Sequence, residues 1–196
     1  MLKFNNTSEI EPLEGILGQE RAIEAMEIGL KIDNPAYNMY LAGDSGTGKT
    51  TYAMNALNKY AAKSFDYIKV NSVTDITGFG LLGHALEMAK ASNVSIEINS
   101  KDVPILDGAI DMANMGIIPA GMYRNKEYIS RDVNIIDVDT AIEDILYDPQ
   151  TSGGLLISVK EELADKLVED MKLNGSIEAK IIGSVKKKEE KYITVI

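Results

Sequence analysis

The 196-residue chain has no cysteine and no tryptophan, and it carries a single histidine. The absence of cysteine excludes disulfides, thiolate metal sites and a cysteine nucleophile. No apolar run approaches the ~20 residues that a transmembrane helix needs, and the N-terminus lacks the charged-then-apolar pattern of a secretory signal. We therefore expect a cytoplasmic protein that does not enter a membrane.

Positive charge is also scarce. The chain holds 20 Lys and Arg against 30 Asp and Glu, which gives a formal net charge of −10. Because proteins that bind nucleic acids present a basic footprint, we expect no nucleic-acid partner. Hydrophobic residues make up 45% and charged residues 26%, as in globular domains, and the few aromatics predict a mostly aliphatic core.

Hydrophobic periodicity predicts an α/β (α+β) chain. The predicted helices span residues 19–31, 49–63, 81–91, 106–115, 139–146 and 160–173, and the predicted strands span residues 37–42, 67–71, 94–98, 154–159, 178–184 and 192–196. Residues 120–135 are predicted to be rich in loops. The charged run at 186–191 is typical of the solvated tip of a hairpin, here between the last two strands.

The helix at 160–173 carries the clearest signals. Ser158 and Glu161 form a possible capping box, and Gly175 suits the position after the last helical turn. Its apolar stripe predicts a buried face made of Leu163, Leu167, Val168 and Met171.

A complete G-x-x-x-x-G-K-[ST] phosphate loop occupies residues 43–50, between an apolar strand and a helix. In such a loop, glycines let backbone N–H groups converge on phosphate oxygens, the lysine reaches the β/γ phosphates and a hydroxyl holds Mg²⁺. We therefore expect ATP and Mg²⁺ as ligands. The predicted nucleotide-binding residues are Gly43, Ser45, Gly46, Thr47, Gly48, Lys49 and Thr50.

The segment from Glu11 to about Ala53 resembles the start of an AAA+ ATPase module of the Lon-like protease type. The stretches that carry the resemblance are PLEGILGQERA at 12–22, YNMYLAG at 37–43 and the loop itself. No Walker B strand follows; the nearest imitation, at 133–139, is better interpreted as an ordinary strand followed by a helix cap. Hydrolysis would lack its water-activating and charge-stabilising parts, so we interpret the loop as a nucleotide-binding relic.

Two further motifs, TDITGFGLLGH at 74–84 and DPQTSGGLL at 148–156, belong to a different pattern. Together with the stretches at 54–61, 103–106 and 121–125, they resemble the C-terminal half of selenophosphate synthetase (selenide, water dikinase). The resemblance implies the C-terminal domain fold of the selenophosphate synthetase and aminoimidazole ribonucleotide synthetase type. It also implies ATP-dependent formation of selenophosphate from selenide, with AMP and phosphate as the other products.

Asp75 is the candidate metal ligand. It precedes glycines that allow a close backbone approach, and a carboxylate there could hold a hard cation that bridges phosphates. From the residues alone, the favoured interpretation is that Asp75 caps a turn or the helix that follows; the resemblance implies instead that it binds Mg²⁺. His84, in the first turn of that helix, is expected to be a packed or surface residue.

Two other features carry open alternatives. From composition, residues 148–154 are a turn-rich loop before a buried strand, whereas the resemblance implies that they form part of an active-site wall. Arg124 and Asn125 could contact an anion or simply lie on the surface.

We therefore divide the chain into a Walker A fragment of AAA+ origin, residues 1–53, and a selenophosphate synthetase C-terminal domain, residues 54–196. The family's other half carries the Cys or selenocysteine, the essential lysine, further aspartates and the dimer barrel. No residue is assigned as catalytic, and the chain alone is expected to be inactive. A homodimer or a separate N-terminal synthetase half is the expected partner.

Three hypotheses remain open at this point: a partial selenide, water dikinase, a Lon-like ATP-binding fragment, and a non-catalytic fusion product.

Overall fold

The computed structural model describes residues 64–65, 68–151 and 153–196. These belong to one compact unit, Ala53–Ile196. The phosphate loop, its seven predicted nucleotide-binding residues and the elements predicted before residue 64 lie outside the described residues. No helix in the described ranges is long and apolar enough to cross a membrane.

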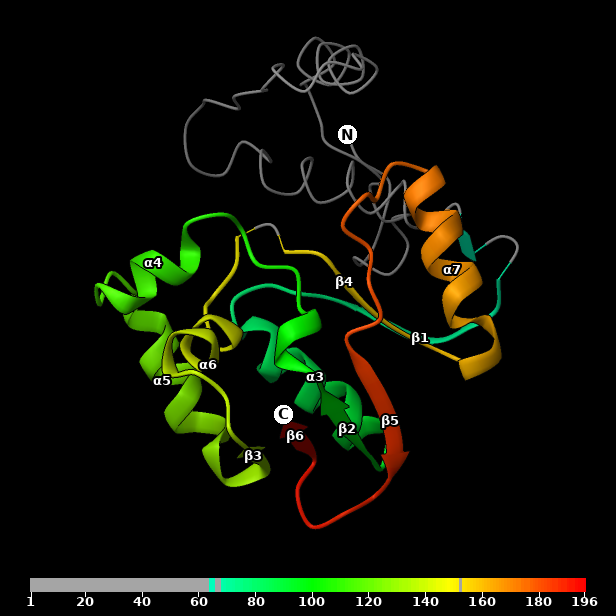
Figure 1. Ribbon diagram of the computed structural model, residues 1–196. Helices are drawn as coiled ribbons and strands as arrows, with labels where there is room; N and C mark the ends of the chain where they lie inside the picture. Colours follow the sequence, from blue (N-terminus) through cyan, green and yellow to red (C-terminus); the bar gives the residue numbers. More distant parts are fainter. Residues whose placement is uncertain (1–63, 66–67, 152) are drawn as a thin grey trace, which may run out of the picture. The chain divides into compact units, whose positions relative to one another are not determined.

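The described chain is α/β and builds two sheets (Figure 1). In chain order the elements are β1 (Val70–Asp75), α3 (Gly80–Ser92), β2 (Val94–Ile98), η2 (Ser100–Asp102), α4 (Ala109–Asn114), α5 (Ala120–Ile129), η3 (Ser130–Asp132), β3 (Val133–Ile135), α6 (Thr140–Leu146), β4 (Leu155–Val159), α7 (Glu161–Leu173), β5 (Gly183–Lys187) and β6 (Ile193–Val195). Strands β1 and β4 pair antiparallel as a two-stranded ribbon. The other sheet has the order β3-β6-β2-β5.

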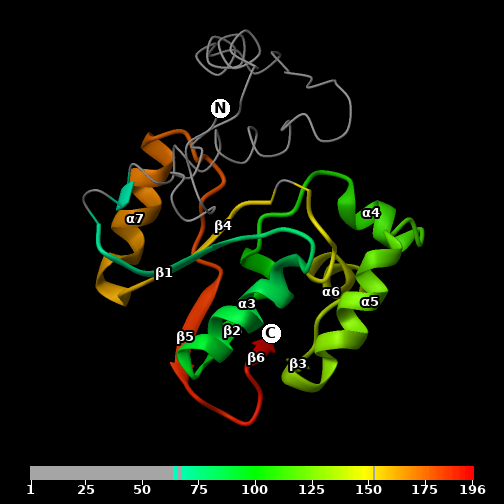
Figure 2. The same cartoon turned by 180° about the vertical axis from the view of Figure 1, so that it is seen from behind.

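The core lies between the four-stranded sheet and the helices α3 and α5, which Figure 2 shows from behind. Leu82, Ala85 and Ala89 of α3 have no exposed surface, and neither do Ile193 and Val195 of β6. Fully burying an aliphatic side chain of leucine size contributes roughly 1.5–3 kcal/mol to stability. The aliphatic core expected from composition is confirmed, and it fixes α3 against the sheet.

The predicted hairpin between the last two strands is wrong. β2 lies between β5 and β6, pairing antiparallel with β5 and parallel with β6. The physical reason is burial: Ile96 and Ile98 of β2 are buried, so this strand takes the middle of the sheet. β5, whose residues are mostly exposed, forms its edge.

Several predicted elements are confirmed. β2 has the predicted bounds and α3 differs from its prediction by one residue at each end. Asp139 caps α6 by accepting from the Ala141 N–H at 2.9 Å. Since β3 precedes this cap, residues 133–139 are the ordinary strand and helix cap of our interpretation.

The prediction that residues 120–135 are rich in loops is wrong, because these residues form α5, η3 and β3. Only Met122 and Ile129 of α5 are buried, seven positions apart on one helical face. This stripe is too sparse to be recognised from periodicity, and the helix depends on tertiary packing instead. α4 is also shorter than predicted, because Gly108 precedes it with a φ of +79°.

The predicted capping box of α7 is wrong. Ser158 lies inside β4, opposite Ser72 of β1, and Lys160 occupies the N-cap without a side-chain hydrogen bond. Gly175 follows the C-cap with a φ of +102°, as predicted. On the predicted apolar face Leu167 is buried, while its three predicted neighbours are half-buried.

Gly80 provides a direct test of the packing between α3 and the loop after α6. It has a φ of +70°, and a Cβ there would lie 2.8 Å from the Tyr147 carbonyl carbon and oxygen. We expect Gly80→Ala to lower the free energy of unfolding by the strain of a positive φ, about 1–3 kcal/mol, plus a clash cost of similar size. Urea unfolding monitored by circular dichroism measures the loss.

Gly116→Ala is the matched control for this substitution. Gly116 has a φ of +73° but no described atom within 4 Å of the added Cβ, so it should show the strain alone. Equal losses for the two variants would contradict the close contact at Gly80.

Candidate functional site

The two family-like motifs meet at one end of the β1–β4 ribbon. The Ile76 N–H donates to the Gly154 carbonyl at 2.9 Å, which continues the ladder beyond β1. The Gln150 N–H donates to the Thr77 carbonyl at 3.0 Å. Residues 74–84 and 148–156, more than 60 positions apart, therefore form one structural unit that we call the motif junction.

Glycines make this junction tight. At Gly80 an added Cβ would collide with the backbone of Tyr147 and Asp148, and at Gly153 it would collide with the Ile76 carbonyl oxygen. At Gly121, in α5, it would lie 2.7 Å from the Pro149 side chain. These positions need glycine because two backbones, or a backbone and a ring, approach too closely for a side chain.

Asn125 of α5 bridges the two motifs. Its Nδ2 donates to the Gly78 carbonyl and to the Tyr147 carbonyl, both at 2.9 Å. Both hydrogens of the amide are thereby used. Sequence reasoning left Asn125 between anion contact and a surface role; its structural role is to hold the glycine-rich turn against the loop after α6.

His84 is buried at 8% exposure in the first turn of α3, so the expectation of a packed residue is confirmed. Both ring nitrogens have partners: Nε2 lies 3.0 Å from Thr77 Oγ1, and Nδ1 lies 3.0 Å from Glu87 Oε2. The Phe79 ring packs at 5.7 Å between centroids, tilted by 59°. The imidazole is held from three sides.

Asp75 ends β1 opposite Leu155, with its side chain exposed. The predicted strand ended at residue 71, whereas in the structure β1 extends to Asp75 and carries it to the junction. The described residues contain no group of three or more His, Cys, Asp or Glu side chains that could hold a metal ion. An exposed carboxylate suits Mg²⁺, which keeps several waters and takes one or two carboxylates together with phosphates. Asp75 can therefore supply one ligand of a shared cation site.

Burial raises the pKa of two neighbouring side chains here, Asp148 in the junction and Tyr147 directly before it. Asp148 Oδ1 is buried without a hydrogen-bond partner among the described residues, and burial raises the pKa of its carboxyl above the ordinary value. Burial, with the nearby Glu143 carboxylate, raises the pKa of Tyr147 to about 12. Desolvation disfavours the charged form of both groups.

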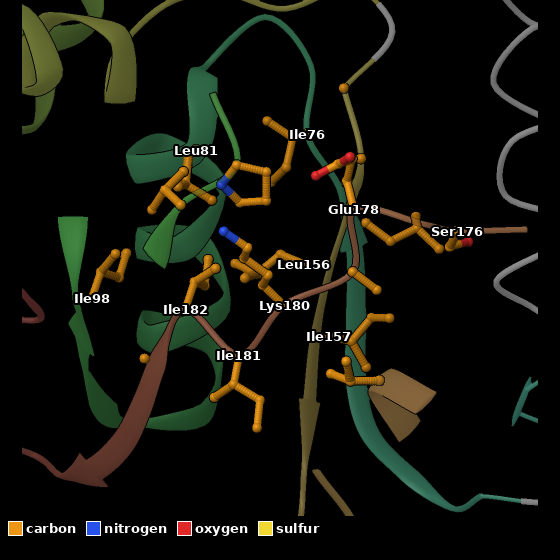
Figure 3. Close-up of a pocket in the computed structure, with 18 of the residues that line it drawn as sticks. Ile76, Leu81, Ile98, Leu156, Ile157, Ser176, Glu178, Lys180, Ile181 and Ile182 are labelled. Atoms are coloured by element: carbon orange, nitrogen blue, oxygen red, sulfur yellow. The ribbon is translucent and has the colours of Figure 1, made fainter. Parts of the chain in front are cut away.

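A cavity of about 780 Å³ opens beside the junction, bounded by the ribbon, α7 and residues 175–185 (Figure 3). Its walls are mostly aliphatic, with Ile76, Leu156 and Ile182 among the lining residues. The charged residues labelled there, Glu178 and Lys180, are exposed. Its mostly apolar lining offers little that could bind phosphate, whereas the motif junction presents the exposed carboxylate of Asp75.

Comparisons with known proteins find relatives in the family that the two junction motifs resemble. Residues 49–196 match the family described as AIR synthase related protein, C-terminal domain. The chain is 63% identical over 178 residues to selenide, water dikinase of Clostridioides difficile, covering 90% of this chain and 51% of the relative. It is 54% identical over 169 residues to selenide, water dikinase 2 of Peptoclostridium acidaminophilum, covering 86% of this chain and 49% of the relative.

The extent of these matches bears on the domain organisation. The chain spans about half the length of the curated relatives it matches. The 178-residue match is longer than the segment 54–196, so it extends into the first 53 residues. Among solved structures, hydrogenase maturation protein HypE matches with 19% identity and a TM-score of 0.44, over 67% of this chain and 33% of that one. Thiamine monophosphate kinase of Aquifex aeolicus matches with 19% identity and a TM-score of 0.40, over 92% and 47%.

Asn125→Asp tests the bridge between the motifs. The carboxylate is nearly isosteric but cannot donate, so two carbonyl oxygens lose their donors. We expect the free energy of unfolding to fall by about 1–3 kcal/mol. Asn134→Asp makes the same change at an exposed position of β3 and should stay within about 0.5 kcal/mol. Urea unfolding of both variants measures the difference, and equal effects would show that the bridge contributes nothing.

Asp148→Asn tests the desolvated carboxyl through its pH dependence. Because the folded-state pKa is raised, the wild type loses stability as pH rises from the ordinary pKa of an aspartate through the raised value. The stability of Asp148→Asn relative to wild type should therefore increase as pH rises through this range. Asp107→Asn, at an exposed position, controls for the change in net charge. A pH-independent difference in unfolding free energy would contradict the desolvation of Asp148.

Proposed function

The chain belongs to the AIR synthase related proteins through their C-terminal domain, and on that basis we propose that it is the C-terminal part of a selenide, water dikinase. The observation that supports this most is the motif junction. The two segments that resemble this family come together there, beside the exposed carboxylate of Asp75. The 63% identity to a curated selenide, water dikinase supports the same substrate class.

The proposed reaction uses ATP, selenide and water and gives selenophosphate, AMP and phosphate. A bound Mg²⁺ would neutralise charge on the reacting phosphates. The contribution of this chain is to position: Asp75 presents an oxygen ligand at the end of β1, and the junction fixes the backbone around it. Phosphoryl transfer depends mainly on such positioning and on charge stabilisation.

The other half of the relatives is the expected source of the remaining groups. The described residues hold a single exposed carboxylate at the junction and no cluster of metal-ligating side chains. The curated relatives are about twice as long as this chain. We infer that an N-terminal half of the selenide, water dikinase type completes the site.

The phosphate loop carries a second candidate function. Its complete pattern supports nucleotide binding by Gly43, Ser45, Gly46, Thr47, Gly48, Lys49 and Thr50, as in a Lon-like AAA+ ATPase. The family match begins at Lys49 and the 178-residue match extends further towards the N-terminus, so the boundary at residue 53 stays a prediction. We propose that nucleotide bound there, if it is bound, does not enter the selenium chemistry.

Complementation tests the proposed function. The full chain is incubated with ATP, Mg²⁺ and selenide, alone and with the separately produced N-terminal half of the Clostridioides difficile relative. We expect phosphorus NMR to detect selenophosphate only when both are present. Asp75→Asn should reduce the rate by decades, since members of a catalytic set act together, while Lys49→Ala should leave it unchanged.

Two results would contradict the proposal. Selenophosphate made by the chain alone would show that no second half is needed. A stable complex of the two halves that makes no selenophosphate would remove the proposed activity.

A further inference from the structure

Helix α4 and the residues beside it present apolar side chains to solvent. No residue of α4 is buried, although the helix contains Ile110 and Met112. Leu106, before the helix, is 85% exposed, and Ile117, after it, is 62% exposed. Apolar side chains that gather on a surface mark places where a protein binds another protein, and methionine is enriched in such interfaces.

A groove of about 520 Å³ lies between this segment and the motif junction. Its lining combines Leu106, Met112 and Ile117 with residues 148–151 of the junction. We call it the α4 groove. A protein seated in this groove would therefore lie directly beside the site that a second half has to complete.

The segment around α4 is held in place by its own hydrogen bonds. Gly108 and Gly116, with φ values of +79° and +73°, form the turns before and after the helix. The Gly116 N–H donates to the Ala113 carbonyl and the Ile117 N–H donates to the Met112 carbonyl, both at 2.9 Å. The apolar side chains are thus presented by an ordered backbone, which lowers the ordering that binding must impose.

The charge around the α4 groove is negative. Residues 103–119 contain Asp107 and Asp111, both exposed, and no lysine, arginine or histidine. A second copy of this chain, docked groove to groove about a two-fold axis, would bring these carboxylates against their own counterparts, which is unfavourable. The groove therefore suits a different protein, with an apolar centre and a basic rim.

We propose that the α4 groove is the surface on which an N-terminal half of the selenide, water dikinase type docks. Apolar side chains of that half would cover Leu106, Met112 and Ile117, and basic side chains would face Asp107 and Asp111. This chain covers 51% and 49% of two curated relatives, so the rest of such a relative is the source of the partner. The inference rests on the proposed function, because it names the surface that the second half uses.

Isothermal titration calorimetry of the full chain with the separately produced N-terminal half of the Clostridioides difficile relative tests the groove. Leu106→Ser combined with Ile117→Ser removes the apolar contact and should weaken binding by about 10–100-fold. Asp107→Lys combined with Asp111→Lys should also weaken binding. That second loss should shrink as salt is added, because salt screens exposed charges.

The controls lie on or directly after α7, which Figures 1 and 2 show on the opposite side of the described domain from α4. Leu173→Ser combined with Ile177→Ser removes two apolar side chains that are 87% and 73% exposed. Asp165→Lys combined with Glu169→Lys makes the same charge change at exposed positions of α7. Both double variants should bind as the wild type does.

Measurements on the chain alone distinguish other occupants of the α4 groove. If another part of this chain covered it, Leu106→Ser with Ile117→Ser would lower the melting temperature more than the Leu173 and Ile177 control does. If a second copy covered it, light scattering would find a dimer that this double variant converts to a monomer. We expect equal melting temperatures and equal molar masses, and either difference would overturn the proposal.

Binding and selenophosphate formation together separate this inference from the proposed function. Halves that bind and make selenophosphate equally well with the groove variant, or binding that falls equally in the α7 controls, overturn the docking surface and leave the proposed function standing. A complex that the groove variant weakens but that makes no selenophosphate supports the surface and removes the activity. Halves that neither bind nor make selenophosphate remove both.

Discussion

The close approach of the glycine-rich turn to the loop after α6 is the constraint on which the rest of the domain depends. Gly80 lies so near the carbonyls of Tyr147 and Asp148 that no side chain fits between them. This contact joins the start of α3 to the end of α6, and the same two segments then enter the β1–β4 ribbon. The contact at Gly80 therefore links the helix that packs on the sheet to the ribbon that carries Asp75.

Such a contact requires that the polar groups of both backbones find partners. Asn125 supplies two donors and Gln150 a third, so the carbonyls of Gly78, Tyr147 and Thr77 are satisfied. Asp148 departs from this pattern, with a buried oxygen that has no described partner. Desolvated ionisable groups are concentrated where proteins do chemistry. Asp148 belongs to the motif junction, so its burial agrees with a functional surface there.

The sequence predicted what depends on local pattern and missed what depends on tertiary partners. The alternation in β2 and the cap of α6 at Asp139 are local signals, and both were found. The order of the strands was missed, because nothing near residues 183–195 shows that β2 inserts between β5 and β6. The role of Asn125 was missed for the same reason: its partners lie 47 and 22 residues away.

For the site itself, the sequence located the two motifs and Asp75, but not the connection between them. The contact of His84 with Glu87 follows the i, i+3 spacing of one helical face, which the sequence shows. The second contact of His84, with Thr77 seven residues earlier, forms only because the turn brings the two side chains together. A helical pattern alone cannot predict that contact, since Thr77 precedes the helix and the turn at Gly78–Gly80 decides its direction.

The geometry also shows how the described domain can hold the Asp75 carboxylate in place by itself. Asp75 ends a ribbon whose hydrogen bonds are all internal to the described domain, so its position needs no partner. Divalent cations, in contrast, need more oxygens than one carboxylate provides. The domain can thus hold this carboxylate in place before any further ligand is bound. Preorganisation of this kind reduces the ordering that binding must otherwise impose, which is the general route by which fixed ligands gain affinity.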